Sequence, residues 1–174
     1  MTRLTILAAI AALAFSLTNA APVRAAEDPV PGTYALPTGN QVFELRRWAR
    51  HKEPLDHRTG PGPHYYDFVN EGPLGKVAHG PFPNSRPLYS CGRVYKYYSS
   101  NTAEDRFTST DPGCEGFAAD NPHFIGYIST VHVAGTAPLF RCFDDGGRMQ
   151  NHFDTLDTNC EGKRTIGILG FVIL

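Results

Sequence analysis

The sequence predicts an all-β protein with a β-trefoil-like fold, built from three units of about 45–50 residues with pseudo-threefold symmetry. Two observations carry this prediction. The chain contains 17 Gly and 14 Pro, and no window of a dozen residues shows clear helical periodicity. A pattern at residues 105–116 also returns at residues 151–162, with Phe, Asp, Cys, Glu and Gly at matching places. Repeated units of this kind bury a core by packing against one another.

The N-terminus is expected to be an export signal at residues 1–25, because Arg3 precedes an apolar run at residues 4–17 and small residues follow. This run is too short to span a membrane, which takes about 20 residues. Residues 26–174 are long enough for a single domain with its own core.

The charge of the chain beyond the signal is mildly acidic. Without Arg3 and Arg24, 14 basic and 17 acidic side chains remain, and they form no basic stripe. Nucleic acid and anionic membranes attract clustered Lys and Arg. The composition therefore predicts no nucleic-acid partner and no membrane partner.

Three short strands are expected in each unit, and the units cover about residues 42–86, 87–137 and 138–174. The nine segments with strand character are residues 42–46, 56–59, 74–77, 87–91, 105–108, 125–128, 138–142, 151–154 and 169–172. The lead-in at residues 27–41 contains several Pro and Gly and has room for at most one short strand, near residues 34–36.

The four cysteines are expected to form two disulfides, as is typical of an exported chain with an even number of cysteines. When the units are aligned, Cys91 and Cys142 share one position, and Cys114 and Cys160 share another. If these two positions touch within each unit, Cys91 pairs with Cys114 and Cys142 pairs with Cys160.

The first unit has no cysteines. Counting the same offsets there reaches Leu45 and Tyr65, which form an apolar pair at the two positions. We therefore expect apolar burial to close in the first unit the contact that a disulfide closes in the other two.

The repeated pattern resembles a known repeat. Pro-Leu-Tyr/Phe-x-Cys, Asp-(His/Arg)-Phe-x-Ser/Thr, Asp-x-x-Cys-Glu-Gly and Ile/Leu-Gly-Tyr/Phe are similar to a family of exported bacterial and fungal proteins of unknown function, often attached to secreted hydrolases. Residues 87–174 match well and residues 42–86 poorly, with Arg58 in place of the Phe of the other units. The resemblance implies extracellular residence and a threefold β fold of binding-module type, and it implies no catalytic residue.

A looser resemblance is to the ricin-B-like trefoil lectins. Those proteins carry a Gln-x-Trp motif in each unit, which is missing here, and Trp48 is the only Trp of the chain. The resemblance therefore does not imply that sugar is bound in the manner of that family.

The residues predicted to bind a ligand combine recurring polar positions with the densest aromatic cluster. Asp and Asn beside a basic residue could accept sugar hydroxyls next to an aromatic platform, or could satisfy turn amides instead. The tyrosines could equally pack in the core. The predicted ligand-binding residues are Asp105, Arg106, Tyr97, Tyr98, Asn151 and His152, with Asp56 and His57 at the corresponding place in the first unit.

The acidic residues after the cysteines, Glu115 and Glu161, are either ligand contacts or solvated charges, and we expect solvated charges. A metal site formed by His57, His64 and Asp67 is the alternative to exposed loop histidines. The chain has neither a Gly-x-Ser-x-Gly nor a His-Glu-x-x-His motif. We expect no catalytic residue, no metal and no cofactor.

These observations predict a secreted, disulfide-stabilised binding module that recognises carbohydrate of a cell wall or extracellular matrix. The alternative is a proteinaceous inhibitor of a secreted hydrolase or protease that presents residues 59–64 or 80–86 as a loop. A purely structural surface protein is the third possibility. The expected partner is a glycan or an extracellular protein, bound by a monomer.

Overall fold

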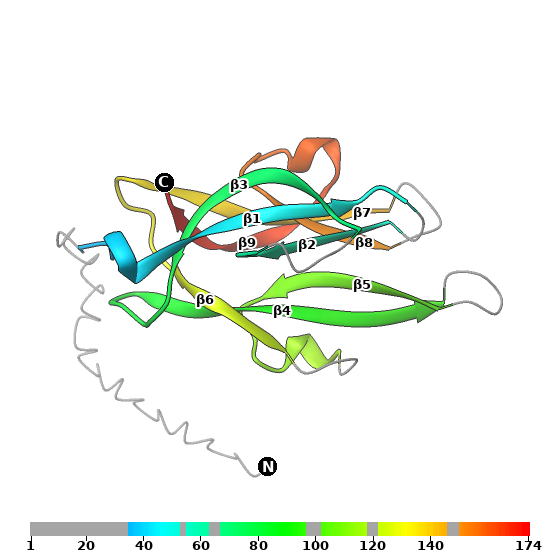
Figure 1. The fold of residues 1–174 in the computed structure, drawn as a ribbon, viewed down its shortest axis with the longest axis horizontal. Coiled ribbons are helices and arrows are strands. Elements are labelled where there is room, and N and C mark those ends of the chain that lie inside the picture. The colour runs from blue at the N-terminus through cyan, green and yellow to red at the C-terminus, as the bar shows by residue number, and fades with distance from the viewer. Residues whose placement is uncertain (1–34, 53–54, 63–66, 97–101, 118–121, 146–149) are drawn as a thin grey trace, which may run out of the picture. The chain divides into compact units, whose positions relative to one another are not determined.

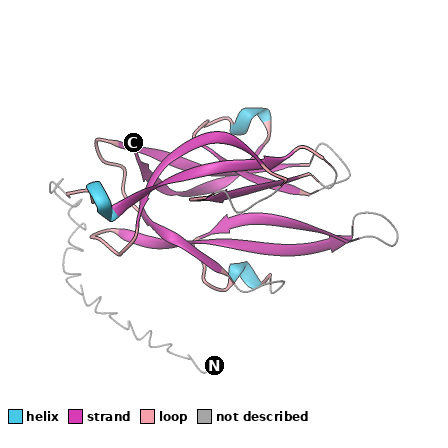
Figure 2. Cartoon of the chain, viewed as in Figure 1, coloured by secondary structure: helices cyan, strands magenta, loops and turns pink. Residues whose placement is uncertain are grey.

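The protein is all β over the part of the chain that the structure describes (Figures 1 and 2). This computed structural model describes residues 35–52, 55–62, 67–96, 102–117, 122–145 and 150–174. The nine strands are β1 (Val42–Arg50), β2 (Asp56–Gly60), β3 (Val69–Ala78), β4 (Ser85–Lys96), β5 (Thr102–Ser109), β6 (His123–Ser129), β7 (Thr136–Asp144), β8 (Asn151–Thr155) and β9 (Arg164–Ile173). Three short 3-10 helices accompany them: η1 (Gly39–Gln41), η2 (Cys114–Gly116) and η3 (Cys160–Gly162).

Each of the nine predicted strand segments lies within one of these strands. The observed strands are longer because their ends continue the ladders with neighbouring strands beyond the apolar residues that predicted them. No strand forms at residues 35–38, where a strand was expected near 34–36; Leu36 instead precedes η1.

The strands form three successive groups with the same antiparallel pairing. We call β1–β3 group 1, β4–β6 group 2 and β7–β9 group 3. In each group the first strand lies between the other two. The third strands β3, β6 and β9 pair with one another over short stretches, and the second strands β2, β5 and β8 also lie in contact. The three hairpins of first and second strands are visible in Figure 1.

The core lies where the first strands face the third strands. Leu45, Leu88 and Leu139 are fully buried, and each stands opposite a glycine of the third strand in its group. One of these glycines is Gly170, with φ +151°, where an added Cβ would come within 2.6 Å of the Ser129 carbonyl oxygen of group 2. The leucines therefore pack at a place where the backbones of two groups approach closely.

This register corrects the predicted alignment of group 1. Leu45 corresponds to the core leucines of the other groups and not to their cysteines. The position of Cys91 and Cys142 is held by Trp48, which pairs with Arg58 as those cysteines pair with Phe. The predicted alignment matches Phe43 to Tyr89 and Phe140. Phe43 lies two residues before its core leucine, whereas Tyr89 and Phe140 lie one residue after theirs, so the alignment is shifted by three residues. Tyr65 lies outside the described residues.

Two disulfides fasten groups 2 and 3. Cys91 is bonded to Cys114 and Cys142 to Cys160, with Cα–Cα distances of 5.6 and 5.7 Å, as the alignment of these two units predicts. Each disulfide joins the central strand of its group to the 3-10 helix that follows the second strand. Disulfides are typical of an extracellular or otherwise oxidising compartment. Among the described residues, no helix has the length and apolar character needed to cross a membrane.

Candidate functional site

A buried polar ring joins the three hairpins. Its members occupy corresponding positions on the second strands, and each bonds to the strand of the next group. The contacts are Asp56 Oδ1 with the Arg106 N–H (3.3 Å), Asp105 Oδ1 with the His152 N–H (2.9 Å) and Asn151 Oδ1 with His57 Nδ1 (3.0 Å). These polar groups are satisfied by the protein itself, as buried groups require. The ring therefore favours a structural role, although the amides belong to neighbouring strands and not to turns.

A second buried polar contact lies on the same strands, three residues after the ring positions Asp105 and Asn151. Thr108 Oγ1 lies 2.7 Å from both carboxylate oxygens of Asp154 and donates its proton to them. Burial raises the pKa of Asp154, although hydrogen bonds from Thr59 and Thr108 act in the opposite direction. Asp154 thus links the same three hairpins near their centre.

The structure brings part of the predicted ligand set together, but in the buried polar ring. Tyr97 and Tyr98 lie outside the described residues. Asp105 and Asn151 are buried in the ring, and the His152 Nδ1 atom lies 2.7 Å from Asp105 Oδ2. The remaining residue of the predicted set, Arg106, lines a cavity that is described below, so this residue is the one placed where a ligand could reach it.

The predicted metal set is not assembled over the described part of the chain. His57 contacts Asn151, and Asp67 lies 3.3 Å from an amino group of Arg50. His64 is outside the described residues. Among the residues that are described, no group of three His, Cys, Asp or Glu side chains could hold a metal ion.

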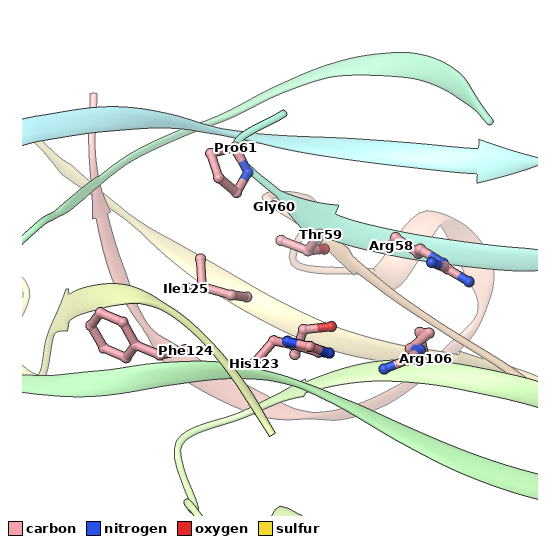
Figure 3. Close-up of a pocket in the computed structure, with 9 residues that line it drawn as sticks. Arg58, Thr59, Gly60, Pro61, Arg106, His123, Phe124 and Ile125 are labelled. Carbon is pink, nitrogen blue, oxygen red and sulfur yellow. The ribbon is translucent and has the colours of Figure 1, made fainter. Parts of the chain in front are cut away.

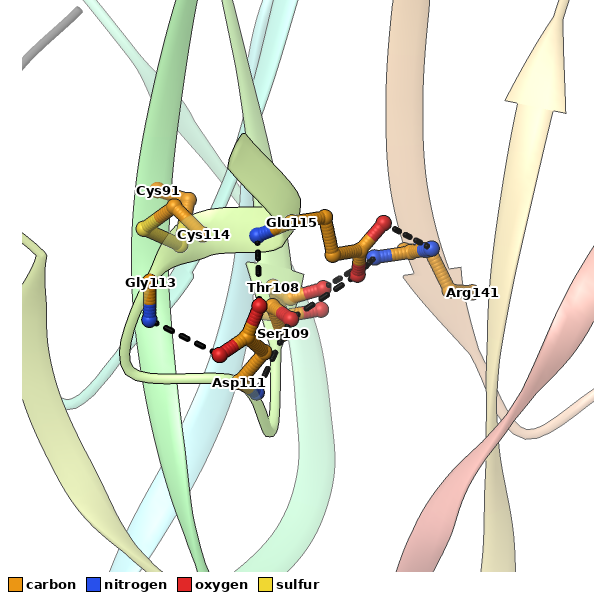
Figure 4. Close-up of a disulfide and its surroundings, with 8 residues drawn as sticks. All are labelled: Cys91, Thr108, Ser109, Asp111, Gly113, Cys114, Glu115 and Arg141. Carbon is orange, nitrogen blue, oxygen red and sulfur yellow. Dashed lines mark hydrogen bonds and ion pairs between the residues drawn. A yellow bond between two sulfur atoms is a disulfide. The ribbon is translucent and has the colours of Figure 1, made fainter. Parts of the chain in front are cut away.

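Group 3 meets group 2 through a network centred on Arg141 of β7 (Figure 4). Its guanidinium donates to the Thr108 carbonyl oxygen (2.9 Å) and to both carboxylate oxygens of Glu115 (2.6 and 3.1 Å). The guanidinium also lies over the Phe107 ring, 5.4 Å from its centroid, and Ser109 Oγ donates to Glu115 (2.8 Å). The hydrogen bond from Arg141 lowers the pKa of Glu115. We call this contact a closed junction.

Group 1 meets group 3 through a second closed junction. Arg47 donates to the Asp154 carbonyl oxygen (3.3 Å) and to Glu161 (2.5 and 3.4 Å), and it lies 5.6 Å from the Phe153 ring centroid. Thr155 takes the place of Ser109 and bonds to Glu161. Burial acts to raise the pKa of Glu161, but the hydrogen bonds from Arg47 and Thr155 bring it below its usual value.

These two junctions correct the expectation that Glu115 and Glu161 are solvated charges. Both carboxylates are partly exposed, but each is bound by an arginine from the first strand of the next group. The signal is not visible along the sequence, because Arg47 and Glu161 are 114 positions apart.

The third contact, between group 2 and group 1, shows no such network among the described residues, and we call it the open junction. Ser90 occupies the position of the junction arginine, since it directly precedes Cys91 as Arg141 precedes Cys142. Arg58 stands at the position of the Phe ring, and Gly60 at the position of the Ser or Thr that holds the glutamate. The junction glutamate lies ten residues after the ring residue in groups 2 and 3. The tenth residue after Asp56 is Tyr66, which lies outside the described residues.

A cavity of about 390 Å³ opens at this junction, between β2, β4, β5 and β6 (Figure 3). Its volume is within the range of ligand pockets. All three described replacements are in its wall. The lining residues are Arg58, Thr59, Gly60, Pro61, Ser90, Arg106, His123, Phe124 and Ile125. Ser90 is much smaller than the junction arginines Arg47 and Arg141, and Gly60 has no side chain, so both leave space at this junction.

The cavity has two chemically different ends. Figure 3 shows Arg58 and Arg106 close to each other at one end, and Phe124 and Ile125 toward the other. Sequence reasoning identified Arg106 and noticed that Arg58 departs from the pattern, but it missed Ser90, His123 and Phe124. Ser90 could have been found by comparing residue 90 with Arg141 in the aligned units; His123 and Phe124 lie outside the repeated pattern.

The fold and the cavity define an all-β, disulfide-bonded protein with a polar and partly apolar ligand-sized cavity between two strand groups. Comparisons with protein-family models, with curated proteins and with solved structures gave no match to this chain.

Proposed function

We propose that the protein is a secreted binding module that recognises carbohydrate of a cell wall or extracellular matrix, with the sugar bound in the cavity of the open junction. The observation that carries this proposal is the asymmetry of the junctions. Two are filled by an arginine, a glutamate and an aromatic ring, and the third has lost these side chains at the place where the cavity lies.

The cavity wall offers the contacts that sugars use. Phe124 is half exposed, and its ring is held from two sides by Tyr89 and Tyr127, with centroid distances of 6.0 and 5.3 Å. A ring fixed in this way can stack against the C–H face of a pyranose. Arg58 and Arg106 provide side chains that can hydrogen-bond to hydroxyl groups.

We also propose that the three groups form a β-trefoil and that the protein is exported. The common pairing order of the three groups supports a pseudo-threefold, β-trefoil-like arrangement. The disulfides and the signal-like residues 1–25 support export, and we propose that the module acts as a monomer.

Closing the open junction tests the site directly. Ser90→Arg places at this junction the residue that Arg47 and Arg141 supply at the other two, and the longer side chain should fill the cavity. A glycan array first identifies polysaccharides bound by the unmodified protein, and titration calorimetry then measures the variant. We expect at least a tenfold loss of affinity with an unchanged circular dichroism spectrum.

The matched control is Ser90→Ala, which keeps the cavity open and should bind within about threefold of the unmodified protein. Full affinity in a folded Ser90→Arg variant would place the sugar elsewhere. If the folded, unmodified protein binds no polysaccharide or peptidoglycan on the array, the carbohydrate proposal is wrong.

The second candidate function is inhibition of a secreted hydrolase or protease. The turn at residues 80–86 favours it, because Asn84 has φ +56° and its carbonyl oxygen accepts a 2.7 Å bond from the Thr130 N–H. A loop held in one conformation loses little entropy on binding. Full activity of a panel of secreted proteases in the presence of excess protein would count against this candidate.

A further inference from the structure

We infer that the ligand of the open-junction cavity is an anionic sugar, whose carboxylate or sulfate group lies at the end formed by Arg58 and Arg106. This inference rests on the proposed function and specifies the class of sugar. It follows from the charge of the wall, from the occupant of the two closed junctions and from the separation of the two ends.

The wall of the cavity carries cationic groups and no acidic ones among its described residues. These cationic groups are the guanidinium groups of Arg58 and Arg106. The acidic partners of the two arginines are not among the lining residues. Asp56 Oδ2 is 3.2 Å from Arg58 Nε, and Glu104 pairs with Arg106. These ion pairs fix the directions of the two guanidinium groups, which is how arginine is prepared to bind a planar acid group.

The closed junctions show which group this place accepts. In both, a carboxylate lies beside the second strand and is bound by an arginine, Glu115 by Arg141 and Glu161 by Arg47. At the open junction the corresponding residue of the sequence, Tyr66, has no carboxylate. The open junction has an arginine on its second strand, Arg58, which can bind an acid group from a ligand as Arg47 and Arg141 bind the glutamates.

The other end of the cavity excludes a simple inorganic anion as the whole ligand. Pro61, Phe124 and Ile125 form an apolar wall there, and about 390 Å³ is much more than one small anion fills. A uronic acid or a sulfated sugar has both required parts, an acid group on one side and a ring with apolar C–H faces on the other.

The experiment compares three ligands of equal length by titration calorimetry: oligogalacturonate, its neutral galactan counterpart and a sulfated galactan. We expect at least one anionic ligand to bind ten times more tightly than the neutral one, with an advantage that shrinks as salt is raised. Comparison of the two anionic ligands tells which acid group is preferred. Equal binding of neutral and anionic sugars overturns this inference and leaves the proposed function standing; no binding of any sugar overturns both.

Two variants locate the acid group. Arg58→Phe introduces the residue that groups 2 and 3 carry at this position, so the fold has two precedents for it, and Arg106→Gln removes the other cation while keeping a hydrogen-bonding side chain. Each should reduce the affinity for the anionic sugar at least tenfold and that for the neutral one much less. The control, Arg164→Gln, removes one positive charge from an exposed residue at the start of β9. If both cavity variants behave like this control, the inference is wrong.

Discussion

The closed junctions and the open junction lie at equivalent places of the three strand groups. Side chains fill the two closed junctions, whereas the open junction contains a cavity. At a closed junction, an arginine crosses from one group to the next and binds a backbone carbonyl, a glutamate and an aromatic ring at once. At the open junction, Ser90 and Gly60 leave this space to solvent or a ligand. The strands therefore keep the same pairing whether a junction is filled by an arginine network or contains a cavity.

The closed junctions derive their stability mainly from burial. An exposed ion pair contributes little because water screens it. Arg141 is largely buried, however, and it donates a hydrogen bond to the Thr108 carbonyl oxygen.

Removing a disulfide should have the largest effect. Cys142→Ala together with Cys160→Ala frees a cross-link between residues 18 positions apart, and we expect the free energy of unfolding to fall by about 3 kcal/mol. Urea unfolding monitored by Trp48 fluorescence measures it. The same pair of changes at Cys91 and Cys114 is the matched comparison. A loss below about 1 kcal/mol in both would show that the core leucines and the junctions hold groups 2 and 3 without the disulfides.

Replacing the ring aspartate of group 1 should change the pH dependence of stability. Burial raises the pKa of Asp56 from 3.8 to about 6, although Arg58 and the Arg106 amide act in the opposite direction. Between these two values the folded state keeps a proton that the unfolded state has released, so the free energy of unfolding decreases as pH rises through this window, by up to about 3 kcal/mol.

Asp56→Asn, which introduces the residue that group 3 carries as Asn151, should remove this decrease. Urea unfolding of both proteins at pH 4 and pH 7 gives the difference. If the unmodified protein and the variant lose the same free energy between the two pH values, Asp56 does not retain its proton in the folded state.

Removing a junction arginine should have an intermediate effect. Arg141→Ala should lower the free energy of unfolding by about 2 kcal/mol, because the Thr108 carbonyl loses the Arg141 donor and Glu115 loses its charged partner. The lowered pKa of Glu115 means that its part of this stability is present above its ordinary pKa and is lost as pH falls through the lowered value. Thermal unfolding at pH 7 and pH 3 measures both quantities, and an effect that grows toward pH 3 would contradict the assignment.

The smallest effect is expected at the open junction. Ser90→Ala should change the free energy of unfolding by less than about 0.5 kcal/mol, since Ser90 is only partly buried and lines a cavity. Thermal unfolding beside Arg141→Ala makes the comparison direct. If the two variants lose the same free energy of unfolding, Ser90 stabilises the open junction as much as Arg141 stabilises a closed one.

The sequence by itself determined the all-β class, the positions of the nine strands and the pairing of the four cysteines. These features depend on local alternation and on short offsets between repeated residues, such as the separation of Cys91 and Cys114 by 23 positions. The register of group 1 failed because Phe43 resembles the wrong aromatic residues, and only the pairing of Leu45 with Gly75 places it correctly.

Only the tertiary structure decided what the recurring polar residues do. The sequence allows Asp105 and Asn151 to be either sugar-binding groups or structural residues, and the structure buries their side chains against the next strand group. The cavity likewise depends on contacts between groups, with Arg58 of β2 brought beside Ser90 of β4 and Phe124 of β6. Such contacts join residues far apart in the chain, and no local pattern specifies which side chain of one group fills the space beside another.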